Sequence, residues 1–137
     1  MKAVVDTNVI VGAVVEDTDI HEEAAGILEG LDEAVVPLIV LYELAWVFRK
    51  LGIPARHLAS VYESLLSNPR VRIVAEKPAD LYAASRYISS RGLSLRRFND
   101  EVILRTAARL GLPLVTFDKE LARRAAELGV TVIGHRP

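Results

Sequence analysis

Hydrophobic residues in this chain are grouped in two ways, as short continuous runs and as longer stretches with helical spacing. The short runs are bounded by polar or turn-forming residues, which is typical of buried strands. They cover residues 3–5, 34–36, 71–74, 113–117 and 130–133. Between them, apolar side chains recur three or four positions apart, a spacing that predicts amphipathic helices. These helices are expected over residues 9–15, 21–31, 38–51, 55–66, 79–90, 99–110 and from residue 118 onward.

The order of these elements indicates an α/β fold. Strands that alternate with helices are typical of a parallel sheet covered by helices on both faces. We therefore expect a three-layer α/β/α arrangement around a central parallel sheet of four to five strands. No repeat, low-complexity segment or linker divides residues 1–137, so a single domain is expected over this range.

Two kinds of residue mark where helices begin and end. Asp17, Thr18 and Asp19 are expected to start the helix over residues 21–31, because short polar side chains cap helix N-termini. Gly52 and Pro54 are expected to stop the helix that precedes them. The stretch from 91 to 98 has no clear period and is expected to be irregular and basic.

Composition narrows the chemistry that the chain can perform. The absence of cysteine excludes disulfides, thiolate catalysis and thiolate-bound metals. The three histidines, His21, His57 and His135, are far apart and are expected to be ordinary surface or loop residues. A formal net charge of -1 gives no global basic field toward nucleic acid. No apolar run approaches the roughly 18 residues of a membrane span, and no signal-peptide pattern is present, so a cytoplasmic protein is expected.

Four acidic residues are predicted to meet at one edge of the sheet. Asp6 and Asp118 each follow a strand, and the carboxyl ends of parallel strands lie together. Asp100 begins a helix that runs antiparallel to the strand after it, which returns its N-terminus to the same edge. Glu43 lies early in the helix after the second strand. Ligands of open α/β sheets bind at this edge, so it is the candidate site.

Each acid also has a purely structural interpretation. Asp118 is a good helix N-cap and Asp6 could stabilise a turn. Asp100 could cap its helix, although it shares a stripe with apolar residues, whereas Glu101 is expected to be a solvated acid paired with Arg97 and Arg105. Glu43 has apolar neighbours at helical spacing and could instead pair with a structural arginine. One shared cation explains all four together, because clustered carboxylates repel one another unless they are neutralised.

An acidic cluster with only oxygen donors suits a hard cation, Mg²⁺ or Mn²⁺. Asp6 and Asp100 are the expected direct ligands, while Glu43 and Asp118 are expected to bind a second ion, hold its waters or orient the nucleophile. Such a site can activate water for attack on a phosphodiester. The basic residues nearest to the predicted ligands, Arg96 and Arg97, are the candidates for contact with such a polyanionic substrate, which the resemblance described next implies is RNA.

These motifs together resemble the PIN-domain nucleases, and most closely the small VapC-type toxins of prokaryotes. The segments that carry the resemblance are residues 4–10, 42–44, 99–107 and 114–118. The resemblance implies that Asp6, Glu43, Asp100 and Asp118 are the catalytic and metal-binding acids, supported by Thr7, Asn8 and Thr116. Two residues depart from the family pattern, Glu101 where a small residue is common and Phe117 where a polar residue is.

The same resemblance implies an endoribonuclease that acts on RNA, forms a homodimer and is inhibited by a cognate antitoxin. A stand-alone PIN endoribonuclease in RNA processing and a non-catalytic PIN-fold binding module are the alternatives within the fold. A receiver-like signalling domain is disfavoured, because residues 73–76 offer no phosphoacceptor aspartate after the third strand. An Asp-x-Asp phosphatase is disfavoured because Asn8 occupies the place of the second acid.

Overall fold

The computed structural model describes residues 1–134, and it contains a five-stranded sheet in the order β3-β2-β1-β4-β5. Every neighbouring pair of strands is parallel. The strands are β1 Lys2–Val5, β2 Glu33–Pro37, β3 Val71–Val74, β4 Leu114–Val115 and β5 Val132–Ile133. The predicted α/β class with a parallel sheet of four to five strands is confirmed.

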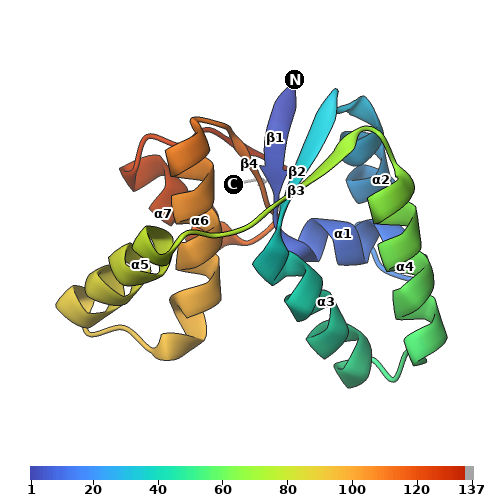
Figure 1. Cartoon of the computed structure of the whole chain (residues 1–137), viewed down its shortest axis with the longest axis horizontal. Coiled ribbons are helices and arrows are strands. Elements are labelled where there is room, and N and C mark those ends of the chain that lie inside the picture. The colour runs from blue at the N-terminus through green and yellow to red at the C-terminus, as the bar shows by residue number, and fades with distance from the viewer. Residues whose placement is uncertain (135–137) are drawn as a thin grey trace.

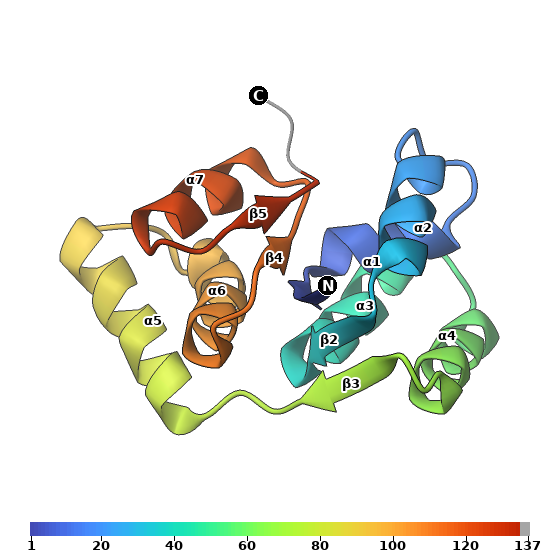
Figure 2. The ribbon, with the colours of Figure 1, turned by 90° about the horizontal axis from the view of Figure 1, so that it is seen from above.

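Helices cover the sheet on both sides (Figures 1 and 2). The helices are α1 Thr7–Val14, α2 His21–Gly30, α3 Leu38–Lys50, α4 Ala55–Ser67, α5 Pro78–Arg91, the 3₁₀ turn η1 Leu95–Arg97, α6 Phe98–Leu110 and α7 Lys119–Glu127. The first four helices lie on one side of the sheet, and α5, α6 and α7 lie on the other (Figure 2). The three-layer prediction is therefore confirmed.

The centre of the sheet is the most deeply buried part of the core. Ala3, Val4 and Val5 of β1 are each 0% exposed, because β1 is paired on both edges and covered on both faces. Ile103 and Leu104 of α6 are also 0% exposed. A strand buried on both faces needs a continuous apolar run, which is why the 3–5 run was readable as a strand.

The last two strands are shorter than predicted. The chain leaves β4 after Val115, because the Thr116 hydroxyl turns toward Asp6 and receives a hydrogen bond from the Asp118 amide. β5 begins at Val132 because the amide of Val130 still bonds to the carbonyl of Ala125 at the end of α7. The ladder still continues one residue past β4, where the Thr116 amide donates to the Ile133 carbonyl at 3.0 Å, and Asp118 caps α7 two residues later.

The predicted start of α2 was also wrong in detail. The residue before the helix is Ile20, and it makes no side-chain cap. Thr18 instead bonds backward, its hydroxyl donating to the carbonyl of Val15 at the end of α1. Residues 17–19 therefore bond to the end of α1 and provide no side-chain cap for α2.

Two of the three histidines lie on helices, His21 at the start of α2 and His57 on the exposed side of α4. The ring of His21 is hydrogen-bonded to the carbonyl of Gly12 at 3.0 Å. His135 and the end of the predicted 1–137 domain lie outside the described residues. None of the helices within residues 1–134 is long and apolar enough to cross a membrane.

Candidate active site

Asp6 is the most buried acid of the predicted site. It ends β1 and caps α1, where its Oδ1 accepts a hydrogen bond from the Thr7 amide at 2.8 Å. Its Oδ2 accepts from the Thr116 hydroxyl at 2.8 Å, and the residue is only 4% exposed. The pKa of Asp6 is raised to about 6, mainly by burial and to a smaller extent by the nearby carboxylates of Glu43 and Asp118, although the two hydrogen bonds oppose the rise.

Asp118 is joined to Asp6 through Thr116. The Thr116 oxygen, which donates to Asp6, also accepts from the Asp118 amide at 3.1 Å. Asp118 is the N-cap of α7, with its Oδ1 accepting from the Leu121 amide at 2.9 Å. The structural interpretation of Asp118 is thus correct, and the same carboxylate still lines the candidate cleft.

Asp100 occupies the first turn of α6 and is partly buried. Its pKa is raised to about 7, mainly by burial and further by the carboxylates of Asp6, Asp118 and Glu43. The guanidinium of Arg97 opposes this rise. Among residues 1–134, no hydrogen bond or salt bridge ties down the Asp100 carboxylate, which leaves its oxygens available to a ligand.

Glu43 reaches the same cleft from α3. Its Oε1 accepts from the Thr7 hydroxyl at 2.6 Å, and its Oε2 accepts from the Asn99 amide group at 3.3 Å. Neutral donors on both oxygens hold the carboxylate in place without cancelling its charge. The structural arginine considered for Glu43 is absent from the described part of the chain. Its expected apolar surroundings are incomplete, since the neighbouring Trp46 is 60% exposed.

Together the four acids line one cleft of about 320 Å³. Two of the polar residues predicted to support the acids bond to them directly: Thr7 donates to Glu43 and Thr116 donates to Asp6. The third, Asn8, accepts with its side-chain oxygen from the Phe117 amide at 3.4 Å. The elements that supply the acids are β1, α3, α6 and the cap of α7. Residues far apart in the sequence therefore converge because all of these elements start or end at the carboxyl edge of the sheet (Figure 1).

The donor set of the cleft fits a hard divalent cation. It offers carboxylate oxygens, and no salt bridge within residues 1–134 involves any of the four acids. Burial first, and then the neighbouring carboxylates, raise the pKa values of Asp6 and Asp100, so holding these charges in the cleft without a counter-ion is costly. In the described range the side chains do not already form a coordination-like group of three or more acids or histidines.

The prediction that Glu101 is a solvated acid was wrong, because its side chain is buried and only 4% exposed. Its Oε2 accepts from Arg105 at 3.0 Å, while Arg124 of α7 donates to both of its oxygens at 3.0 and 3.1 Å. Arg97, the other expected partner, pairs instead with Glu120 at 2.6 Å. The α6–α7 packing supplies a guanidinium that sequence spacing within α6 could not indicate.

The remaining basic residues are distributed unevenly around the cleft. Arg97 lies close enough to Asp100 to oppose the rise in its pKa, and Arg96 is exposed next to it. On the opposite side, Arg49 of α3 lies over the ring of Trp46, 5.3 Å from its centroid. Asn99, which donates to Glu43, was not among the predicted site residues, and its polar side chain directly before Asp100 was the available signal.

Comparison with known proteins identifies the family and the fold. A family model described as the PIN domain matches residues 3–127. No curated protein sequence matches the chain. Among solved structures, VapC20 of Mycobacterium tuberculosis, described as a sarcin-ricin loop cleaving toxin, is similar with a TM-score of 0.76 and 16% identity over 89% of this chain and 94% of that one.

Two further structures have the same fold. VapBC2 from Rickettsia felis, bound to a DNA fragment from its promoter, has a TM-score of 0.68 and 20% identity over 97% of this chain and 98% of that one. FitAcB from Neisseria gonorrhoeae has a TM-score of 0.69 and 22% identity over 98% of this chain and 97% of that one. At these identities the likeness concerns the fold.

Proposed function

Because this chain belongs to the PIN-domain family, we propose that it is a divalent-metal-dependent endoribonuclease that hydrolyses RNA phosphodiester bonds at the acid cleft. One observation carries this proposal. Asp6, Glu43, Asp100 and Asp118 come from separate elements and line one cleft. Burial and the neighbouring carboxylates raise the pKa of Asp6 and of Asp100, and within residues 1–134 no salt bridge neutralises any of the four acids. Such an arrangement is a cost to stability that a catalytic site explains.

The residues suited to hold Mg²⁺ or Mn²⁺ are Asp6 and Asp100, with Glu43 and Asp118 on a second ion or on its waters. A bound divalent ion supplies charge neutralisation for the phosphate and a lower pKa for the attacking water. The protein's own contribution is positioning. Thr116 holds Asp6 and the start of α7, while Thr7 and Asn99 hold Glu43, so the carboxylates face the cleft before any ligand arrives.

RNA as the substrate is supported by the family and by the description of VapC20 as a toxin that cleaves the sarcin-ricin loop. Arg96 and Arg97, beside Asp100, are suited to contact the phosphate backbone near the cut. The similarity to VapBC2, and to a structure described as a toxin–antitoxin complex from Klebsiella pneumoniae, supports a role as the toxin of such a pair. We accordingly propose a cognate antitoxin as partner and a homodimer as the assembly.

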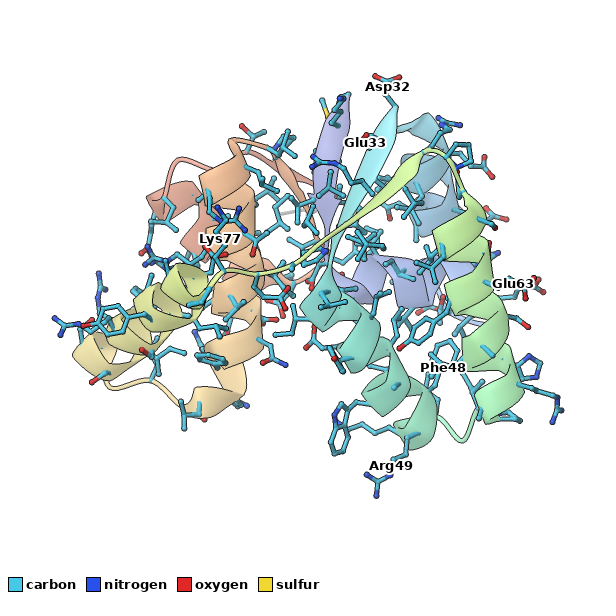
Figure 3. All side chains as sticks on the ribbon, viewed as in Figure 1. Asp32, Glu33, Phe48, Arg49, Glu63 and Lys77 are labelled. Carbon is cyan, nitrogen blue, oxygen red and sulfur yellow. The ribbon has the colours of Figure 1, made fainter. Side chains whose placement is uncertain are left out.

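The test is cleavage of a panel of single-stranded and structured RNAs, with Mg²⁺, with Mn²⁺ and with a chelator. Asp6→Asn and Asp100→Asn each remove a ligand charge and keep the side-chain shape. Asp32→Asn is the matched control, because Asp32 is exposed at the opposite end of the molecule from Arg49 of α3 (Figure 3). We expect metal-dependent cleavage in wild type and Asp32→Asn, and none in the two cleft variants.

The proposal fails if the folded wild type binds neither ion and cleaves no RNA with either one. In that case the PIN fold would serve only as a binding module. Cleavage that survives in both cleft variants would show a contaminating nuclease or a different site. Cleavage limited to one structured precursor RNA would favour the stand-alone processing role over the toxin role.

A further inference from the structure

Two large aromatic side chains are exposed on α3, next to the acid cleft. Tyr42 is 67% exposed and Trp46 is 60% exposed. They are four residues apart, so they lie one above the other on the same helix face. The guanidinium of Arg49, 5.3 Å from the centre of the Trp46 ring, covers the next position along that face.

The positions on α3 fall into three stripes with different surroundings. Val40, Leu44 and Phe48 form the core stripe and are at most 3% exposed. Glu43 and Val47 form a second stripe that lines the cleft. At about 100° per residue, Trp46 lies only about 60° around the helix from Glu43. Trp46 therefore lies beside the stripe that lines the cleft, and Tyr42 lies one turn earlier on the same exposed face; we call this face the rim.

The charge of this rim indicates what kind of ligand it suits. Glu43 is the only acid of α3, and it faces the cleft. The last two residues of the helix, Arg49 and Lys50, are both exposed and basic. Figure 3 shows Arg49 at the end of α3, extending away from the helix. An aromatic face with a cationic end complements a flat ring attached to a phosphate.

We propose that Tyr42 and Trp46 form a stacking platform for the bases of single-stranded RNA that flank the cut phosphodiester, with Arg49 contacting the backbone. This inference rests on the proposed nuclease function and adds a substrate-binding subsite to it. Aromatic side chains bind successive bases by stacking, and the interaction tolerates sequence variation because every base has a π face. The strand then crosses the cleft between this rim and the side that carries Arg96 and Arg97.

Trp46 is the only tryptophan of the chain, so its fluorescence reports on this platform alone. The first measurement is its emission in Asp100→Asn protein, in which the RNA should remain intact, during titration with a short single-stranded RNA in Mg²⁺. The matched ligand is an oligomer of the same length with abasic sites, which keeps the phosphates and removes the bases. We expect strong quenching by the RNA and little by the abasic oligomer.

The second measurement is the affinity of fluorescently labelled RNA for variants of the platform. Trp46→Ala and Tyr42→Ala should each weaken binding by about tenfold, the loss expected for one stacked base. Trp46→Phe should retain most of the affinity, whereas Trp46→Leu, which keeps apolar area without an aromatic face, should not. Tyr82→Ala removes an equally exposed tyrosine, 65%, from α5 and is expected to change nothing.

Three results would overturn the inference. If labelled RNA binds while the Trp46 emission stays constant, the substrate takes another path and only the platform is wrong. If the emission instead depends on protein concentration and Trp46→Ala converts a dimer into monomers, a second copy of the chain covers this face. If wild type neither binds nor cleaves RNA, the proposed function fails first and the platform fails with it.

Discussion

Asp100 and Glu101 are consecutive residues in the first turn of α6, yet their environments are opposite. Glu101 is 4% exposed and is held by the guanidiniums of Arg105 and Arg124. Asp100 is less buried, and its burial together with three nearby carboxylates raises its pKa to about 7. Burial therefore does not distinguish a functional acid from a structural one. What differs is that the described part of the protein supplies an opposite charge to Glu101 and none in direct contact with Asp100.

The two acids also connect different parts of the molecule. Glu101 links α6 to α7, and Arg124 in turn stacks on Tyr87 of α5, 3.5 Å from the ring centre. Asp100 instead lines the cleft with residues from β1 and α3. One turn of helix thus carries both the packing of the α5–α7 layer and part of the candidate site. Substitutions at the two positions should separate stability from activity.

The largest effect is expected for RNA cleavage by Asp100→Asn. Loss of a metal ligand charge should reduce cleavage by about 1000-fold, equivalent to about 4 kcal/mol of transition-state stabilisation. The fold should be intact, since no salt bridge is broken. Rate measurements with saturating Mg²⁺, alongside circular dichroism, check this. Wild-type rates in the variant would mean that Asp100 is not part of the chemistry.

The next largest effect is a loss of unfolding free energy in Glu101→Gln. This change leaves Arg124, whose side chain is 13% exposed, and Arg105 without their shared acid. Unpairing a buried charge costs about 3 kcal/mol or more, to be measured by urea unfolding. Glu127→Gln is the control, because Glu127 pairs with the same arginine but is 47% exposed. An equal, small effect of both variants would show that burial of Glu101 adds nothing.

A smaller effect is expected from pH on the metal-free protein. The folded-state pKa of Asp100, about 7, lies above its ordinary value of 3.8, so its ionised form destabilises the fold above pH 7. That cost disappears as pH falls from about 7 to about 4. Asp100→Asn should therefore melt a few degrees higher than wild type at pH 8 without metal, and the gap should narrow on acidification. A gap that grows at low pH would have the wrong sign.

The smallest effect concerns the pair Arg97–Glu120 at the outer edge of the same region. Both side chains are well exposed, 37% and 54%, so Arg97→Gln should change unfolding free energy by less than about 1 kcal/mol. RNA affinity should nevertheless fall. The slope of log affinity against log salt concentration should also decrease in magnitude by about one, the value for one phosphate contact. Glu120→Gln is the comparison, since it breaks the same pair and keeps the cation. Equal affinity of Arg97→Gln and wild type would remove Arg97 from the RNA path.

The sequence predicted those features that follow from local pattern and topology. Buried parallel strands appear as continuous apolar runs, and the carboxyl edge of the sheet brings Asp6 and Asp118 together. The resemblance to PIN domains, based on four acidic motifs, is confirmed by the family match over residues 3–127. The roles of the acids and of Thr7, Asn8 and Thr116 remain predictions, now with a defined geometry.

The features that the sequence did not predict depend on contacts between distant elements. The partner of Glu101 comes from α7, so helical spacing within α6 suggested Arg97 instead. The capping role assigned to residues 17–19 was wrong because Thr18 bonds to the preceding helix. The exposure of Trp46 depends on where the core stripe of α3 faces, which a mostly apolar helix does not reveal.

The most direct test of the central claim is a calorimetric titration of Mn²⁺ into wild type, Asp100→Asn and Asp32→Asn near pH 7. We predict one or more sites in wild type and Asp32→Asn, affinity at least about tenfold weaker in Asp100→Asn, and proton release on binding, since the pKa of Asp100 is about 7 without metal. Absence of binding to folded wild type, or equal binding to all three proteins, would contradict the claim that these acids form a metal site.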